Sequence, residues 1–344
     1  MSYIEFQDIN KMQFDTIKLI AGDSANICVV VPDFTKDTLE IVKEELYNAG
    51  VANEQYQIIS RIESFAYYAY SQKKELYQNG TVLMDYNASG IDVYRLYCNK
   101  IGDMQYILQE HTLSQPEGST IEKASHSVTM YMTEYFKKHR ASSVYLTGMG
   151  FDVDRLPDEF TKVLVAGRKA FVGQNLYVRG ACFAALEYIS PQVFGNVCLL
   201  TDGRIKADIE TDISEHGRPM KFRIVKMGTN WYMAERTIDF IIEDVSVINF
   251  QIIWPDGKYI EKQVDISSIP YREGKTTRIS MNVKASSQDK CIVTVKDLGF
   301  GEIYQASDSV IVEELDLSEA GVFCVGMGSK LFPKDKVEAE DWAY

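Results

Sequence analysis

The sequence lacks the long hydrophobic runs and the excess of positive charge that mark several large classes of protein. None of its apolar runs approaches the roughly 18 residues of a membrane-spanning helix, and its first residues do not resemble a signal peptide. The formal net charge of −13 argues against non-specific binding to nucleic acid or to an anionic membrane surface. We therefore expect a cytoplasmic protein whose partners include neither nucleic acid nor membrane.

Cysteine and histidine are also sparse. The 6 cysteines are scattered without a Cys-x-x-Cys pair, mostly within apolar stretches, so we expect reduced and mostly buried thiols. They are Cys28, Cys98, Cys182, Cys198, Cys291 and Cys324. The 4 histidines show no metal-ligand spacing, which predicts that the chain has no metal site.

A chain of 344 residues is long enough for two domains, and its first two thirds alternate short apolar runs with amphipathic segments. This alternation is typical of α/β proteins. We expect strands at 26–31, 56–60, 81–86, 90–99, 104–113, 143–147 and 169–172, and helices at 35–48, 62–71, 119–140, 154–164 and 175–188. From residue 81 onward the order is β-β-β-α-β-α-β-α, which describes a ribonuclease-H-like lobe.

From about Met220 the pattern changes to strands alone. Ile248, Phe250, Ile252 and Trp254 occupy every second position before the turn sequence Pro255-Asp256-Gly257. Similar strand-length runs separated by turn residues follow, which favours a β-sandwich.

One segment has the layout of a phosphate-binding hairpin without its glycines. An apolar run ends on Asp85, turns through small residues and resumes as an alternating strand at Gly90. Asp85 would help to hold a metal–phosphate group, with Asn87, Ser89 and backbone amides around it. However, Asn87-Ala88 stands where glycines would allow close approach of the backbone, so the phosphate chemistry is weakened. The alternative is an ordinary hairpin whose aspartate caps a turn.

Two further segments carry glycine or other small residues at helix starts or within a helix. Residues 144–152 form a strand that runs into Gly148 and Gly150, where glycine would let the ribose and adenine of a nucleotide reach the backbone. Such junctions are common, and each alone is a weak signal. In the helix expected at 175–188, residues 180, 181, 184 and 185 are small, which predicts very close packing against a neighbour.

The order and spacing of these segments resemble the actin, hexokinase and heat-shock-chaperone superfamily, and within it the DnaK-type seventy-kilodalton chaperones. The segments that carry the resemblance are Ile27–Pro32, Thr81–Tyr86, Val144–Gly150 (similar to the adenosine motif), Asn175–Ala185 (similar to the connecting helix), Asn196–Asp202 (similar to the interdomain linker) and Ile266–Pro270, Arg278–Val283 and Cys291–Asp297 (similar to the substrate-binding sandwich). The resemblance covers roughly residues 25–310.

The resemblance implies an actin-like ATPase fold with an incomplete first lobe. Its parts are a remnant of lobe I at 1–75, lobe II at 76–195, a linker at 196–215, a β-sandwich at 216–318 and an acidic C-terminal tail at 319–344. It also implies a vestigial nucleotide site at Asp85, Asn87, Ser89, Gly148 and Gly150.

The chain departs from this family where catalysis would need it most. Only about 25 residues precede Asn26, too few for the first phosphate loop and the catalytic lysine. No inserted subdomain separates Asn99 from Ser143, and Glu63 lies one position away from the place of the catalytic glutamate. Because phosphoryl transfer depends on positioning and electrostatics, we expect no ATP hydrolysis, no catalytic residue and at most weak binding of ATP and Mg²⁺.

Three functions follow from these expectations. The leading one is a catalytically degenerate, chaperone-like protein that binds peptides or partner proteins through a sandwich without a helical lid. The second is a nucleotide-dependent ATPase, kinase or chaperone completed by a partner or by a longer native chain. The third is an actin-like scaffold that self-assembles through the sheet edge at Ile27–Val31 and Tyr56–Ser60, unless Tyr3–Phe6 or another protein covers that edge.

Overall fold

The computed structural model describes residues 26–318, apart from 33, 102, 115–119, 192–193, 195, 216 and 244. These residues form two compact units that divide between Asp202 and Gly203. The tail expected at 319–344 and the proposed pairing of Tyr3–Phe6 lie outside the described residues.

The first unit begins with a β-α-β segment. Strands β1 (Ile27–Val31) and β2 (Tyr56–Ser60) form a parallel two-stranded sheet, and helix α2 (Lys36–Asn48) connects them. The buried residues of α2 recur at helical spacing, at Leu39, Val42 and Leu46. β1 and β2 thus pair with each other, and self-association through this sheet stays a prediction.

A six-stranded sheet forms the centre of the first unit, in the order β7-β6-β3-β4-β5-β8. Strand β4 is antiparallel to both of its neighbours, and the remaining pairs are parallel. The strands are β3 (Thr81–Asn87), β4 (Gly90–Ile101), β5 (Met104–Ser114), β6 (Ser143–Thr147), β7 (Lys169–Val172) and β8 (Val197–Leu200), and the helices are α3 (Arg61–Tyr70), α4 (Ile121–Lys138), α5 (Asp158–Val165) and α6 (Leu176–Ile189). The predicted order β-β-β-α-β-α-β-α is confirmed from β3 to α6.

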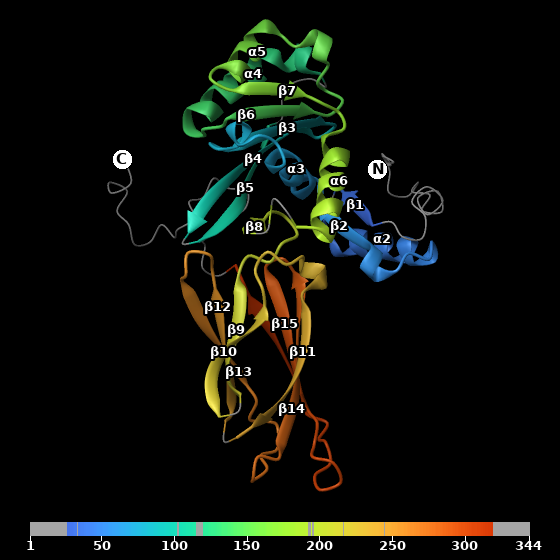
Figure 1. Cartoon of the computed structure of the whole chain (residues 1–344), viewed down its shortest axis with the longest axis vertical. Helices are drawn as coiled ribbons and strands as arrows, with labels where there is room; N and C mark the ends of the chain where they lie inside the picture. The colour runs from blue at the N-terminus through green and yellow to red at the C-terminus, as the bar shows by residue number, and fades with distance from the viewer. Residues whose placement is uncertain are drawn as a thin grey trace, which may run out of the picture. The chain divides into compact units, whose positions relative to one another are not determined.

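The helices cover both faces of this sheet (Figure 1). Buried residues of α4 and α5 pack with one side of β3, β4 and β6, and those of α3 and α6 pack with the other side. Helix α5 begins at Asp158 instead of the expected 154, because Pro157 disfavours helical backbone at the residue before it. Helices α3 and α6 lie so close that a Cβ built on Gly180 would be 1.9 Å from the carbonyl oxygen of Ser64. This confirms the close packing predicted for the helix at 175–188.

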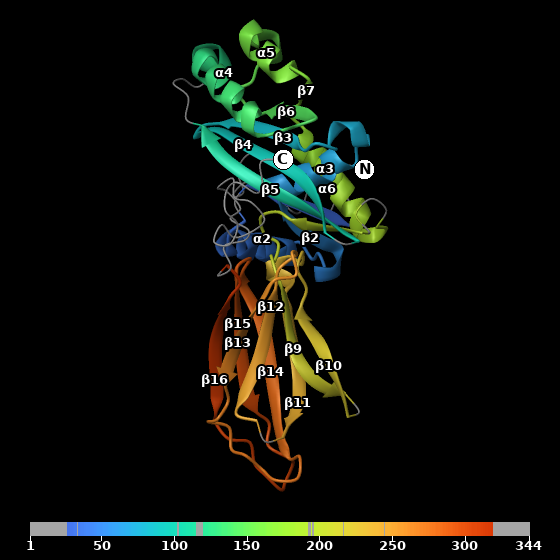
Figure 2. The same ribbon diagram turned by 90° about the vertical axis from the view of Figure 1, so that its left-hand side faces the viewer.

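The second unit consists of two four-stranded antiparallel sheets that lie face to face (Figure 2). Their orders are β10-β9-β12-β13 and β11-β14-β15-β16. The strands are β9 (Asp208–Glu215), β10 (Arg218–Val225), β11 (Glu235–Ile242), β12 (Val247–Ile253), β13 (Tyr259–Asp265), β14 (Thr277–Ser287), β15 (Lys290–Asp297) and β16 (Val310–Asp316). Alternate residues of β14, namely Ile279, Met281 and Val283, are fully buried, as expected for a strand with one face on a core.

The linker expected at 196–215 is wrong, because both ends of this range are strands of a sheet. Strand β8 at its start pairs in parallel with β5, and β9 at its end lies between β10 and β12. The second unit therefore begins at residue 203 and not at 216. The expected linker came from the family resemblance, but Ile209 and Thr211 are buried and alternate with Glu210 and Asp212, which are not, and this is the pattern of a half-buried strand.

Candidate functional site

The Asp85 hairpin and the glycine turn after β6 lie side by side in the structure. Asn87 pairs with Gly90, so β3 and β4 form the predicted hairpin around Ala88 and Ser89. Asp85 pairs in register with Thr147, the last residue of β6. A Cβ built on Gly148 would lie 2.7 Å from Oδ1 of Asp85. The fold thus brings the two predicted motifs together at the ends of neighbouring parallel strands.

The carboxylate of Asp85 is buried and bound by side chains from two helices. The Tyr177 hydroxyl of α6 donates a hydrogen bond of 2.6 Å to Oδ2 of Asp85, and Nη1 of Arg61 on α3 lies 3.9 Å from the same oxygen. Burial raises the pKa of Asp85, while the Tyr177 hydrogen bond and Arg61 oppose that rise. Burial and the Asp85 charge hold the pKa of Tyr177 well above its usual value. Asp85 therefore ties β3 to α3 and α6.

The other side chains of the hairpin form a second polar group. Nδ2 of Asn87 donates to Oδ2 of Asp92 at 2.7 Å, and Nε2 of His111 lies 2.8 Å from Oδ1 of the same carboxylate. Burial alone would raise the pKa of Asp92, but the hydrogen bonds from His111 and Asn87 outweigh it and lower that pKa. The backbone N–H of Ser89 donates to Oδ1 of Asn87 at 2.8 Å. The amide of Ser89 is thus already engaged within the hairpin.

The backbone of the glycine turn is hydrogen-bonded to a side chain of the same unit. The N–H of Gly148 donates to Oε1 of Gln174 at 3.0 Å, and Nε2 of Gln174 donates back to the carbonyl of Gly148 at 3.1 Å. Gly148 has φ +95°, a conformation that favours glycine. A Cβ built on Gly150 would lie 2.3 Å from the ring of Tyr86. Glycine does let a flat ring reach the backbone here, and that ring is Tyr86.

All five predicted site residues therefore lie in one region, and each makes a hydrogen bond to another group of the chain. The N–H groups of Ser89 and Gly148 donate to side chains, so these two donors are engaged within the chain. Glu63 is fully buried within α3. Among the described residues, no group of three or more His, Cys, Asp or Glu side chains could hold a metal ion.

Sequence reasoning missed the residues that complete this region. They are Arg61, Tyr86, His111, Gln174 and Tyr177. Tyr177 lies 92 residues from Asp85 along the chain, and no spacing rule connects such positions. The nearest signal was the start of the helix expected at 175, which carries Tyr177 in its first turn.

Comparison with known proteins gives two family matches. A model described as a family of unknown function (DUF5716), C-terminal, matches residues 11–202, and one described as a domain of unknown function (DUF8552) matches residues 204–317. The two matches meet where the two compact units divide. No curated protein matches the chain.

Proposed function

We propose, for a chain that belongs to the DUF5716 C-terminal family of unknown function, a role in binding peptides or partner proteins without ATP hydrolysis. The first unit would be a catalytically degenerate, ribonuclease-H-like lobe of the actin and heat-shock-chaperone type. The β-β-β-α-β-α-β-α order and the helices on both faces of the sheet support this fold. The second unit, with its two facing sheets, would carry the binding surface.

The occupation of the Asp85 region by the chain's own groups is the observation that carries this proposal. A nucleotide site needs N–H donors and a carboxylate that are preorganised for a ligand. Here the Gln174 side chain is hydrogen-bonded to both the N–H and the carbonyl of Gly148, and the Tyr177 hydroxyl donates a hydrogen bond to the Asp85 carboxylate. Binding a nucleotide would first have to break these hydrogen bonds. We infer that the region now stabilises the lobe instead of binding a ligand.

A cytoplasmic location forms part of this proposal. Thiols persist in reducing compartments, and the five cysteines within the described residues are thiols. No described helix is long and apolar enough to cross a membrane.

Isothermal titration of the full chain with ATP and Mg²⁺ tests the proposal. We expect no saturable heat of binding in a sample whose circular dichroism shows it to be folded. A separate phosphate assay of the same sample should detect no ATP hydrolysis. Asp85→Ala provides the comparison. Binding tighter than about 100 μM (about −5.5 kcal/mol) that is lost in Asp85→Ala would overturn the proposal and restore the nucleotide-dependent alternative.

A further inference from the structure

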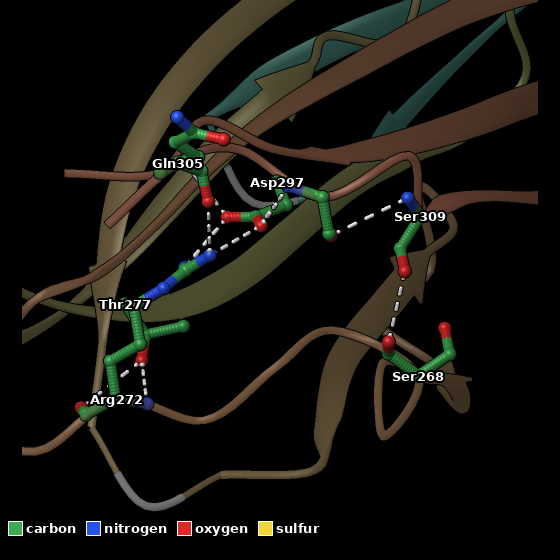
Figure 3. Close-up of polar contacts among 8 residues, drawn as sticks. Ser268, Arg272, Thr277, Asp297, Gln305 and Ser309 are labelled. Carbon is green, nitrogen blue, oxygen red and sulfur yellow. Dashed lines mark hydrogen bonds and ion pairs between the residues drawn. The ribbon is translucent and has the colours of Figure 1, made fainter. Parts of the chain in front are cut away.

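Two loops at one end of the second unit are joined by a buried ion pair. Loop 266–276 connects β13 to β14, and loop 298–309 connects β15 to β16. Arg272 of the first loop binds Asp297 at the base of the second through two hydrogen bonds, Nη1–Oδ1 at 2.8 Å and Nη2–Oδ2 at 2.6 Å (Figure 3). Both side chains are almost fully buried. Separating such a pair would leave an uncompensated charge in the protein interior, which is strongly unfavourable. The pair therefore holds the two loops together.

Further hydrogen bonds hold loop 298–309 from the inside. The carboxylate of Asp297 accepts hydrogen bonds from the N–H groups of Gly299 at 2.9 Å and Ser307 at 2.7 Å. Nη2 of Arg272 donates to the carbonyl of Gln305 at 3.1 Å (Figure 3). The hydroxyl of Ser309 donates to the carbonyl of Ser268 on the other loop. The backbone of the two loops is therefore set before any partner binds.

Glycine allows the tight path of loop 298–309. Gly299 has φ +62°, and a Cβ built there would lie 2.5 Å from both the amide of Ala306 and the carbonyl of Tyr304. Phe300 and Tyr304 then exchange backbone hydrogen bonds across the tip. The tip of loop 298–309 is therefore held by hydrogen bonds of its own backbone.

Loops 266–276 and 298–309 carry large apolar side chains that are exposed to solvent. Ile303 is 72% exposed, Tyr271 61% and Tyr304 40%. Leaving such side chains in water is unfavourable, and aromatic anchors of this kind dominate the binding energy of protein interfaces. Loop 298–309 also contains two glycines and two serines, residue types that are enriched in antibody binding loops. A rigid loop that carries exposed anchors loses little entropy on binding.

The charges beside these anchors indicate the chemistry of the partner. Glu273, Glu302 and Asp308 are exposed on the same two loops. The two cations of loop 266–276 are already paired: Arg272 is buried against Asp297, and Nζ of Lys275 lies 3.1 Å from a carboxylate oxygen of Glu243. The exposed apolar side chains are thus flanked by carboxylates, which favour a basic partner. Tyrosine rings also attract Lys and Arg side chains through cation–π interactions.

We propose that loops 266–276 and 298–309 form a preorganised binding site for an apolar, Lys- or Arg-containing segment of a partner protein. This inference rests on the proposed function and adds to it the place of binding and the class of partner. Apolar side chains of the segment pack on Tyr271, Ile303 and Tyr304, and its basic side chains pair with Glu273, Glu302 and Asp308.

Fluorescence anisotropy with a defined probe tests this site on the full chain. The probe is a fluorescein-labelled dodecapeptide of alternating Leu and Arg, and its counterpart has Glu in place of every Arg. We expect saturable binding of the Arg peptide alone, weakened by added NaCl. The double variant Glu273→Lys/Glu302→Lys should bind at least tenfold more weakly, and Ile303→Ser should also weaken binding because it removes an apolar anchor.

A matched variant separates the site from the general negative charge of the chain. Glu44→Lys/Glu54→Lys makes the same change in net charge at exposed positions of the first unit and should bind within twofold of the unaltered chain. Equal weakening by both double variants, or no binding of the Arg peptide, would overturn the site. Failure of the site would leave the nucleotide titration unchanged, so the two proposals can fail separately.

Discussion

At the scale of single residues, Asp85 is a buried carboxylate that contacts the Tyr177 hydroxyl and the Arg61 guanidinium. Its burial opposes the charged form, and the Tyr177 hydroxyl and Arg61 compensate for part of that cost. A carboxylate kept for a ligand would instead retain unused acceptor capacity, and its removal would often stabilise the protein. The sign of the stability change on substitution therefore distinguishes the two roles.

Tyr177→Phe should lower the free energy of unfolding by about 1–3 kcal/mol, because it removes the hydroxyl that donates to a buried carboxylate. Urea unfolding at neutral pH measures the change. Tyr188→Phe is the control, since Tyr188 is 48% exposed, and it should change the unfolding free energy by less than about 0.5 kcal/mol. Equal stability of Tyr177→Phe and the unaltered chain would refute the structural role of this hydrogen bond.

Asp297 should make the stability of the second unit depend on pH. Its hydrogen bonds with Arg272 hold its pKa well below the usual range. A carboxyl with a lowered folded-state pKa contributes stability above its unfolded pKa of about 3.9, and that contribution is lost as pH falls toward the folded pKa. Urea unfolding between pH 7 and pH 2.5 should show this loss below about pH 4. Asp297→Asn should give a flatter profile, and parallel profiles would contradict the expectation.

At the scale of elements, the sequence predicted the helices and strands from β1 to α6 because the signals were local. Helical spacing gave α2 through Leu39, Val42 and Leu46, and small residues indicated the close packing of α6. Strand β9 was missed because the linker that the family resemblance implied extended over it, although Ile209 and Thr211 are buried in the structure. Strand β8 was missed because four apolar residues fit a linker as well as a strand, and only its pairing with β5 decides between them.

The candidate site was predictable only in part, for a related reason. Asp85 and the glycines stand out within local motifs, and the parallel pairing of β3 with β6 then places them together. Their partners Arg61, Gln174 and Tyr177 belong to other elements. Tertiary packing alone brings those side chains to Asp85 and Gly148, so no single segment of sequence contains the information.

Gly180→Ala should destabilise the first unit by about 1–3 kcal/mol, because its methyl group would collide with the backbone of Ser64 and force α3 and α6 apart. This loss opposes the usual gain of up to about 1 kcal/mol for alanine over glycine inside a helix. Thermal and urea unfolding measure the result. Gly173→Ala is the control, since its nearest neighbour would be the Leu176 side chain at 3.4 Å. A stabilised Gly180→Ala protein would show that the two helices are not in close contact.

At the scale of the whole molecule, two compact units coincide with two family matches. We predict that residues 203–318 fold alone, whereas residues 216–318 do not. The shorter fragment lacks β9, which lies between β10 and β12, so its loss would leave β10 without a partner strand. Circular dichroism and thermal unfolding of both fragments test this boundary. A cooperative transition of the shorter fragment would show that β9 is dispensable.

The central claim is that the Asp85 region stabilises the chain and does not bind a nucleotide. The most direct measurement is the free energy of unfolding of the full chain and of Asp85→Ala, each with and without 5 mM ATP and Mg²⁺ (a concentration at which a Kd of about 100 μM would add about 2 kcal/mol). We predict that Asp85→Ala is less stable than the unaltered chain by about 1–3 kcal/mol and that ATP changes neither protein. Stabilisation of the unaltered chain by ATP, with no loss of stability in ATP-free Asp85→Ala, would contradict the account.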